Sequence, residues 1–333
     1  MTQNRNIKRR VRARAAKTGE SYTTALRHIR QTLPNEPPVT APSVKLAVAQ
    51  VCLRNDPSDS TQLRAAGAEV RDLMRQAQLA GARLIHFPEG TICSPGKRIM
   101  SASGQREIGP SDWTRADWQV LDDELASVSR LARQLELWVV IGCQHRLSPP
   151  HRPHNSLYVI SDEGKLATRY DERMLSHTKI SFMYAPGTGP VTFAVDGLRF
   201  GCALGMETHY PEIFIEYEAL DVDCVLFSTT GELLPNAPTF FAEALGHAAS
   251  NSYWVSFAAH APQSAVAPSG IAAPDGRWAA QCADDGTSSI ATATVTANDP
   301  DHPARPWRRL ARSDIYTPHR VTDDPRSNNR KSF

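Results

Sequence analysis

The feature that most constrains the fold is a regular alternation between short apolar runs and longer segments with helical periodicity. Val44 to Val51 is a short apolar run with β-branched residues, which is typical of a buried strand. Apolar residues then recur every three or four positions from Leu63 to Ala77, and Gly81 stands where a helix would end. Because the same alternation continues to Val295, the sequence predicts an α/β fold.

Tight-turn signals separate several pairs of strand-like runs. They are Asp162-Glu163-Gly164, Asp196-Gly197 and Pro274-Asp275-Gly276. Such turns join antiparallel strands, whereas a helix between two strands allows them to run parallel. A chain with both kinds of connection predicts mixed sheets. No Pro-, Gly- or Ser-rich break interrupts the alternation, so we expect one domain over residues 43–299.

The two ends of the chain differ in composition from this body. Residues 1–42 carry nine Lys or Arg against two acidic residues, although the whole chain has a net charge of only +2. We expect a solvated basic extension with at most one short helix, from Ser21 to Arg30, and a Pro-rich end; contact with nucleic acid is the less favoured alternative. Residues 300–333, rich in Pro, Arg and Asn, predict a C-terminal arm.

The cysteines and histidines restrict the possible classes of protein. Six cysteines occur singly, without a C-x-x-C pair, which argues against structural zinc and favours a reducing, cytoplasmic location. No histidines have metal-ligand spacing, so we expect no metal site. The segment Gly187-Thr188-Gly189 lacks the third glycine and helix of a nucleotide-binding loop, and we expect no cofactor. No run reaches 18 consecutive apolar residues, so the sequence predicts no membrane span.

Polar residues that could carry chemistry stand where predicted strands end. Glu89 follows an apolar run, where a buried carboxylate would suit general-base work, although a turn or capping residue fits equally well. The charged residues 169–175 favour a solvated sheet edge when taken alone. In residues 201–212 a buried strand runs into Gly205 and Pro211 opens a helix, which is how some folds present a nucleophile. A plain glycine turn is the alternative.

Together these segments resemble the nitrilase, or carbon–nitrogen hydrolase, superfamily over about residues 44–299. Residues 79–89 are similar to the family's A-x-x-G-A-x-L-x-x-F-P-E segment and residues 154–156 to its Y-N-S turn. Residues 201–212 are similar to its G-x-x-I-C-x-D-x-x-x-P-E segment. The resemblance implies a nitrilase-like α-β-β-α four-layer sandwich with two mixed β-sheets. It also implies association into homodimers or larger homo-oligomers.

The resemblance implies an active site in altered form. The family's general base falls on Glu89, its lysine on Glu172 and its nucleophilic cysteine on Gly205. Lys179 stands near the place where many members have a second glutamate, so we interpret Glu172 and Lys179 as a charge-reversed pair. The residues expected to bind substrate around them are Arg173, Glu207 and His209.

The loss of the cysteine leaves several possibilities for the chemistry. In the family, a thiolate attacks an amide or nitrile carbon, the lysine stabilises the oxyanion and the glutamate shuttles protons. Here Glu89 could activate water, with Lys179 or Arg173 as the electrophilic partner, or another thiol could substitute. The candidate cysteines are Cys93, Cys143 and Cys202. We predict a hydrolase of a small amide, nitrile or N-carbamoyl substrate; the alternative is an inactive binding or regulatory subunit.

Overall fold

The structure is a computed structural model that describes residues 3–25, 42–231, 237–297, 304–329 and 331. It contains two compact units, residues 1–41 and 42–333, which we describe separately. No helix among the described residues is both long enough and apolar enough to cross a membrane.

The first unit contains a helix that the sequence analysis missed. Helix α1 (Gln3–Thr18) forms where we expected only a solvated extension. Its Ala, Arg and Lys residues have high helix propensity, and neither Pro nor Gly interrupts them. Val11 packs against Ala25, and both are completely buried. The helix expected from Ser21 to Arg30 is present at residues 22–25, and its remainder lies outside the described residues.

The second unit is built on two six-stranded sheets. The strands of the first are β1 (Ser43–Gln50), β2 (Leu84–His86), β3 (Trp138–His145), β4 (His154–Ile160), β5 (Leu166–Asp171) and β12 (Ser289–Thr296). Those of the second are β6 (Thr192–Val195), β7 (Leu198–Leu204), β8 (Cys224–Ser228), β9 (Trp254–Ala258), β10 (Gly270–Ala272) and β11 (Trp278–Gln281).

Both sheets have a parallel centre and antiparallel margins. The orders are β12-β1-β2-β3-β4-β5 and β11-β10-β9-β8-β7-β6. Strands β1, β2 and β3 are parallel neighbours in the first sheet, as are β7, β8 and β9 in the second. Every other pairing is antiparallel. The prediction of two mixed sheets is therefore confirmed.

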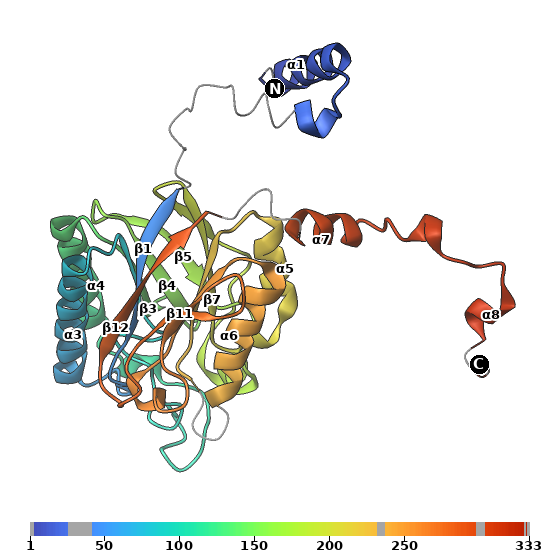
Figure 1. The fold of residues 1–333 in the computed structure, drawn as a ribbon. Helices are drawn as coiled ribbons and strands as arrows, with labels where there is room; N and C mark the ends of the chain where they lie inside the picture. The colour runs from blue at the N-terminus through green and yellow to red at the C-terminus, as the bar shows by residue number, and fades with distance from the viewer. Residues whose placement is uncertain (1–2, 26–41, 232–236, 298–303, 330, 332–333) are drawn as a thin grey trace. The chain divides into compact units, whose positions relative to one another are not determined.

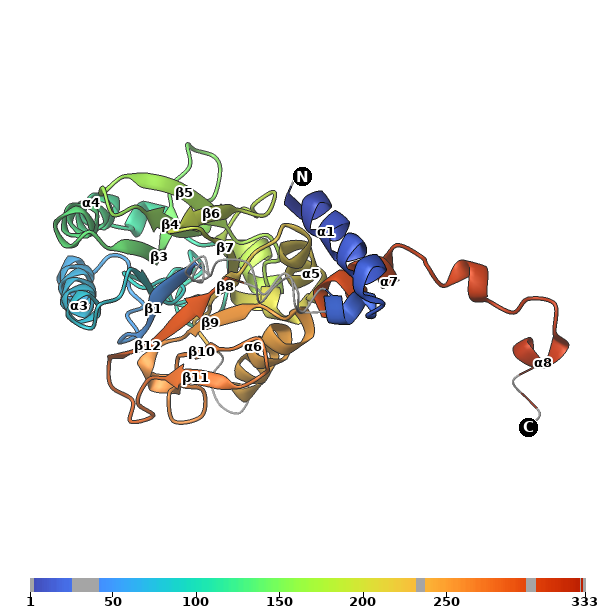
Figure 2. The same cartoon turned by 45° about the horizontal axis from the view of Figure 1, so that its top comes forward.

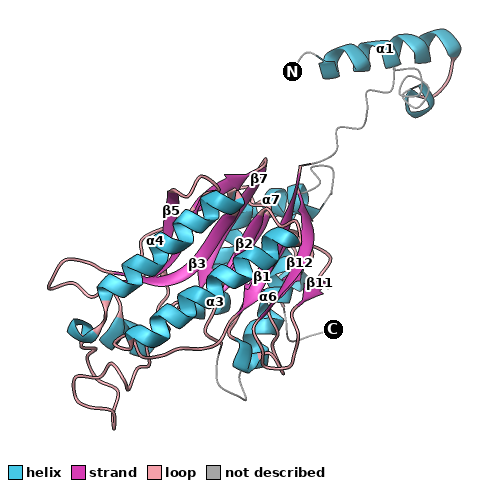
Figure 3. Cartoon of the chain, turned by 90° about the vertical axis from the view of Figure 1, so that its left-hand side faces the viewer, coloured by secondary structure: helices cyan, strands magenta, loops and turns pink. Residues whose placement is uncertain are grey.

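Helices cover the outer face of each sheet and complete four layers. Helices α3 (Ser60–Leu79) and α4 (Trp118–Leu135) lie on the first sheet, as Figure 3 shows from their side. Helices α5 (Pro211–Ala219) and α6 (Ala237–Asn251) lie on the second (Figures 1 and 2). The predicted α-β-β-α sandwich is confirmed.

Alternation along the strands explains how the layers are filled. In β1, Leu46 and Val48 face the core between the two sheets, while Ala47 and Ala49 face the core under α3 and α4. Successive side chains of a strand point to opposite faces. A strand buried on both faces therefore reads as a nearly continuous apolar run.

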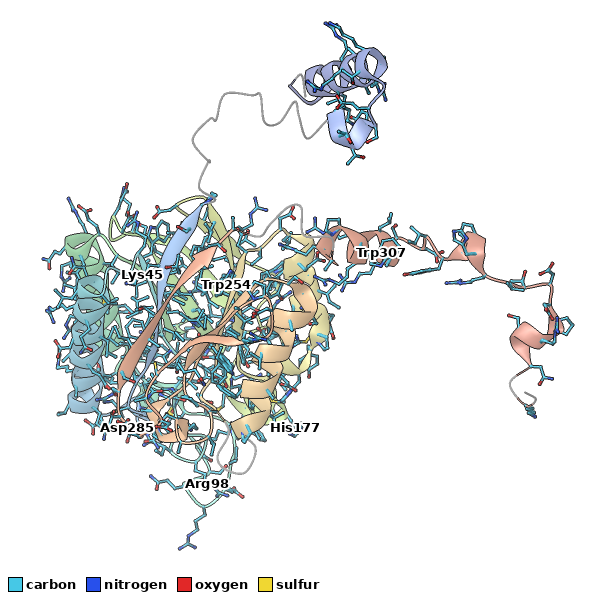
Figure 4. The ribbon with its side chains drawn as sticks, in the orientation of Figure 1. Lys45, Arg98, His177, Trp254, Asp285 and Trp307 are labelled. Carbon is cyan, nitrogen blue, oxygen red and sulfur yellow. The ribbon has the colours of Figure 1, made fainter. Side chains whose placement is uncertain are left out.

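The C-terminal segment also contains helices, α7 (Ala304–Arg312) and α8 (Pro325–Asn328). The basic face of α7 lies on α5, where Arg309 and Arg312 each bind the buried carboxylate of Glu218 at 3.0 Å. Trp307, on the same helix, is 54% exposed (Figure 4). The arm expected from the composition is thus helical where it contacts the body.

The parallel strands of both sheets run toward the same end of the body. In Figure 4, Lys45 of β1 and Trp254 at the start of β9 lie toward one end, and His177 and Arg98 lie at the other. His177 precedes Lys179 by two positions. The loops at this carboxyl end carry the candidate catalytic residues, in agreement with the general placement of sites in α/β sheets.

Candidate active site

Glu89 lies just beyond β2 and is held from several sides. Its Oε1 accepts hydrogen bonds from Lys179 Nζ at 2.5 Å and Asn155 Nδ2 at 2.8 Å, and its Oε2 accepts one from the backbone N–H of Thr230 at 3.0 Å. The carbonyl oxygen of Glu89 accepts a hydrogen bond from His260 Nε2 at 2.8 Å. Only 3% of this residue is exposed. The carboxylate is therefore fixed in place.

The close packing of β3 against this turn requires a glycine. A β carbon at Gly142 would collide with the backbone of Pro88 and Gly90. Beneath the turn, His86 connects the two sheets, with ring nitrogens 2.7 Å from Ser228 Oγ and 2.9 Å from Ser256 Oγ. Burial lowers the pKa of His86 to about 3, so this histidine is neutral. These contacts tie the Glu89 turn to both sheets.

Glu172 and Lys179 meet Glu89 from the far end of β5. Glu172 directly follows that strand and is completely buried. Lys179 opens a single π-helical turn, Lys179–Met183, a rare form that is frequent at functional sites. Its ammonium group donates to Glu172 Oε1 at 3.0 Å and to Glu172 Oε2 at 2.7 Å. The four predicted catalytic positions therefore come together, because Gly205 lies against the same pair.

Asn155 is a member of this cluster that the sequence analysis did not select. Its Nδ2 donates to Glu89 at 2.8 Å and to Glu172 at 2.6 Å. The signal was present, because Asn155 is the central residue of the segment similar to the Y-N-S turn. Thr230 was also missed, and its contribution is a backbone N–H, which no side-chain pattern reveals.

The charges of the cluster separate the pKa values of its two carboxyl groups. Burial raises the pKa of Glu172 to about 8, since the Lys179 charge is opposed by the charges of Glu89 and Glu207. Burial acts on Glu89 in the same sense, but the charge and hydrogen bonds of Lys179, with those of Asn155 and Thr230, hold the pKa of Glu89 below its usual value. Burial disfavours the charged ammonium of Lys179, yet the two carboxylates keep its pKa above the usual range.

Gly205 opens the short turn after β7, Gly205–His209, with a φ of +55°. A β carbon built on this residue would lie 2.5 Å from Glu172 Oε1 and 2.9 Å from Lys179 Nζ. These distances are far below van der Waals contact. The Glu172 carboxyl group therefore occupies the space that any side chain at position 205 would enter.

Glu207 is buried beside this turn, and four donors surround its carboxylate. They are the Tyr170 hydroxyl at 2.6 Å and the backbone N–H groups of Arg173 at 2.6 Å, Leu204 at 2.8 Å and Met174 at 3.3 Å. These bonds join the end of β5 to the end of β7. Glu207 thus positions the two segments that carry Glu172 and Gly205.

Arg173 and His209 direct their side chains to other partners. The Arg173 guanidinium binds Glu216 at 2.8 Å and the Tyr170 hydroxyl at 3.1 Å. His209 lies 2.9 Å from Glu243 of helix α6. Neither side chain makes a hydrogen bond to the Glu89–Glu172–Lys179 cluster among the described residues.

The buried cysteines are poor candidates for a substitute nucleophile. Burial raises the pKa of Cys143 to about 12 and raises the pKa values of Cys93 and Cys202 above the range of ordinary thiols. Thiols with raised pKa values hold little of the reactive thiolate.

No group of three His, Cys, Asp or Glu residues in the described part of the chain could hold a metal ion.

Comparison with known proteins finds a matching family and solved structures of similar fold. A family model described as carbon–nitrogen hydrolase matches residues 45–301. Among solved structures, a cysteine-to-alanine mutant of a nitrilase-superfamily amidase from Nesterenkonia AN1 has a TM-score of 0.63 and 15% identity, covering 82% of this chain and 97% of that one.

Two further structures of the Nesterenkonia sp. AN1 amidase carry ligands. A complex with butyramide has a TM-score of 0.61 and 16% identity over 83% of this chain and 98% of that one. A glutamate-to-glutamine mutant, with the acetamide moiety of fluoroacetamide added at its active-site cysteine, has a TM-score of 0.61 and 15% identity over 84% and 98%. At these identities the likeness establishes a shared fold.

Proposed function

Because this chain belongs to the carbon–nitrogen hydrolase family, we propose that it hydrolyses a small amide-like substrate by activating water, without a covalent thiol intermediate. The observation that carries this proposal is the position of the Glu172 carboxyl group, which takes the space of a nucleophilic side chain beside Gly205. The amidase of similar fold, of which one structure is a complex with butyramide, supports an amide-like substrate.

Glu172 is the group that we assign to proton transfer. Its pKa of about 8 lies near neutral pH, while the pKa of Glu89 is held low. Such separation is typical of acid–base sites. In its ionised form, Glu172 would take a proton from water as the water oxygen attacks the carbonyl carbon. Glu172 would then give this proton to the amide nitrogen, the C–N bond would break, and a carboxylic acid and ammonia would leave.

This assignment moves the acid–base role from Glu89, where the resemblance places it, to Glu172. Glu89 is a weak base because its pKa is held below the usual value, whereas the pKa of Glu172 is raised. Its role in the proposal is to keep Lys179 charged and in place. The Lys179 side chain is 12% exposed, against 4% for Glu89 and 0% for Glu172. We therefore place the substrate carbonyl oxygen beside the Lys179 ammonium group.

The experiment is to measure ammonia release from a panel of amides, nitriles and N-carbamoyl compounds. Glu172→Gln should abolish release, and the wild-type rate should rise with pH toward a plateau above about pH 8, as Glu172 ionises. Glu163→Gln, at a carboxylate 67% exposed on a hairpin turn, is the matched control and should retain the wild-type rate. Loss of a covalent nucleophile commonly costs several orders of magnitude in rate, so long incubations are needed. Equal release by wild type and Glu172→Gln, or none by either, would remove the proposal.

A second candidate function, binding without catalysis, is favoured by a different observation. The three N–H groups of Lys179 have three carboxylate oxygens as acceptors, one from Glu89 and two from Glu172. An ammonium group that is already satisfied must exchange a hydrogen bond before it can stabilise an oxyanion. Calorimetric titration separates the two functions. Saturable binding of a panel amide that is weakened by Lys179→Met, with no ammonia released, would establish binding alone.

A further inference from the structure

A surface hollow of about 440 Å³ lies outside the catalytic cluster and contains none of its residues. One wall is the segment before and at the start of helix α4, with Trp113 and Trp118. The other is the connection between β3 and β4, with Arg146, His151 and Arg152. Ligand sites for small molecules typically have volumes of about 300–1,000 Å³. The hollow is therefore large enough for a molecule of one or two rings.

The aromatic wall of the hollow is held rigidly. Trp113 Nε1 donates to the carbonyl oxygen of Met183 at 2.9 Å, and Trp118 Nε1 donates to the carbonyl oxygen of Trp113 at 3.1 Å. The Trp113 ring also packs against Tyr184, with centroids 5.5 Å apart. Because both indole N–H groups already have acceptors, the rings offer apolar, flat surfaces to a ligand. A prearranged wall reduces the entropy that binding would lose.

The opposite wall carries positive charge without matching carboxylates. Among the described residues, neither Arg146 nor Arg152 has an ion pair. The Arg146 guanidinium lies over the Trp118 ring, 5.6 Å from its centroid. Asp112 also lines the hollow, but its Oδ1 accepts hydrogen bonds from the backbone N–H and hydroxyl of Thr114. Guanidinium groups bind carboxylates through paired hydrogen bonds.

We propose that this hollow is a second small-molecule site that binds an aromatic carboxylate. The ring would lie against Trp113 and Trp118, and the carboxylate would pair with Arg146 and Arg152. Both features are required, since a flat neutral ring leaves the guanidinium groups unpaired and a saturated carboxylate loses contact with the indoles.

The site shares a structural element with the catalytic cluster. The backbone N–H of Ser111, which lines the hollow, donates to Phe182 O at 3.0 Å, and Trp113 binds Met183 O. Phe182 and Met183 belong to the π-helical turn that begins at Lys179. The proposal does not depend on catalysis, because its residues are separate from those of the cluster.

The test is calorimetric titration of the full chain with 1-naphthoate, cyclohexanecarboxylate and the neutral 1-naphthalenemethanol. We expect one saturable site for 1-naphthoate and at least about tenfold weaker binding of the other two, since the alcohol lacks the charge that pairs with the guanidinium groups and the saturated ring lacks the flat contact with the indoles. Arg146→Gln and Arg152→Gln should each weaken 1-naphthoate binding by about tenfold or more. Arg75→Gln, an exposed arginine of α3 outside the hollow, is the matched control and should leave the affinity unchanged.

Three outcomes would overturn the proposal. One is the absence of saturable 1-naphthoate binding up to millimolar concentrations. Another is equal affinity in wild type, Arg146→Gln and Arg152→Gln, with circular dichroism confirming that the variants are folded. The third is binding that is lost in Lys179→Met but kept in Arg146→Gln, which would place the ligand in the catalytic cluster.

Discussion

Two completely buried glutamates, Glu172 and Glu207, are held by different kinds of hydrogen-bond donor. Glu207 accepts hydrogen bonds from a tyrosine hydroxyl and from the backbone N–H groups of Leu204, Arg173 and Met174. Glu172 accepts them from the Lys179 ammonium group and from a side-chain amide. Burial raises the pKa of both carboxyl groups.

The difference indicates which carboxylate can take part in chemistry. Backbone donors move only if the turn itself is rebuilt, so the partners of Glu207, all backbone groups except the buried Tyr170 hydroxyl, adjust little to a substrate. The partners of Glu172 are side chains, which can exchange hydrogen bonds while the backbone stays in place. We therefore interpret Glu207 as a residue that positions the site and Glu172 as the residue that changes its protonation state.

The largest effect should come from removing the positioning carboxylate. Glu207→Ala leaves four donors without their acceptor, and we expect a loss of about 3–5 kcal/mol in the free energy of unfolding. Glu172→Ala should lose less free energy of unfolding, because Lys179 keeps the Glu89 carboxylate as its partner. Urea denaturation of both variants measures the difference. Equal losses would contradict the distinction between the two glutamates.

The next largest effect concerns the space beside Gly205. Gly205→Cys places a β carbon 2.5 Å from Glu172 Oε1 at a positive φ, and we expect a destabilisation of about 1–3 kcal/mol from overpacking. Combining it with Glu172→Ala should remove part of this loss, with a coupling energy of about 0.5–3 kcal/mol in a double-mutant cycle. Strict additivity of the two changes would show that Glu172 does not occupy this space.

A related variant tests whether position 205 is the elbow of a nucleophile. With Gly205→Cys and Glu172→Lys together, the new thiol lies beside two ammonium groups, and nearby positive charge promotes the reactive thiolate. We expect alkylation by fluoroacetamide at the introduced cysteine, detected by mass spectrometry. Modification of the native cysteines alone would contradict the placement.

The pH dependence of stability should distinguish Glu172 from a freely titrating carboxylate. Its pKa of about 8 in the folded protein lies above the ordinary value of 4.5. Between these values the folded state keeps a proton that the unfolded state releases, so the stability contributed by this group is complete below about pH 4.5 and is lost as pH rises through 8. Within that window, the free energy of unfolding of the wild type should therefore fall by up to about 1.4 kcal/mol per pH unit relative to that of Glu172→Gln. Denaturation of both proteins at pH 5, 6, 7 and 8 measures this difference. If the free energies of unfolding of the two proteins changed equally with pH, the raised pKa would be refuted.

The smallest effect is expected at the part-exposed histidine beyond the elbow. His209→Gln breaks a pair with Glu243 in which both side chains are about one-third exposed. The free energy of unfolding should therefore fall by at most about 1 kcal/mol. Amide binding should be unchanged, because His209 makes no hydrogen bond to the described cluster. Weaker amide binding in this variant would restore His209 as a substrate-binding residue.

Much of the fold could be predicted because its signals are local. Apolar runs, helical periodicity and Asp-Gly turns depend on neighbouring residues, and they locate β1, α3 and the β6–β7 hairpin near their observed bounds. Helix α1 was missed because its residues are mostly polar or charged and show no strong apolar stripe. Its formation depends on propensity and on the contact between Val11 and Ala25, which a search for periodicity does not register.

The sequence by itself determined the family, the sandwich and the identities of the unusual residues at positions 172, 179 and 205. The tertiary structure decided how these residues are used. Only the folded chain brings the Lys179 ammonium group between two carboxylates and places Glu172 in the space beside Gly205. The physical reason is that pKa values and steric exclusion depend on distances between segments far apart in the chain, whereas strands and helices are encoded within single segments.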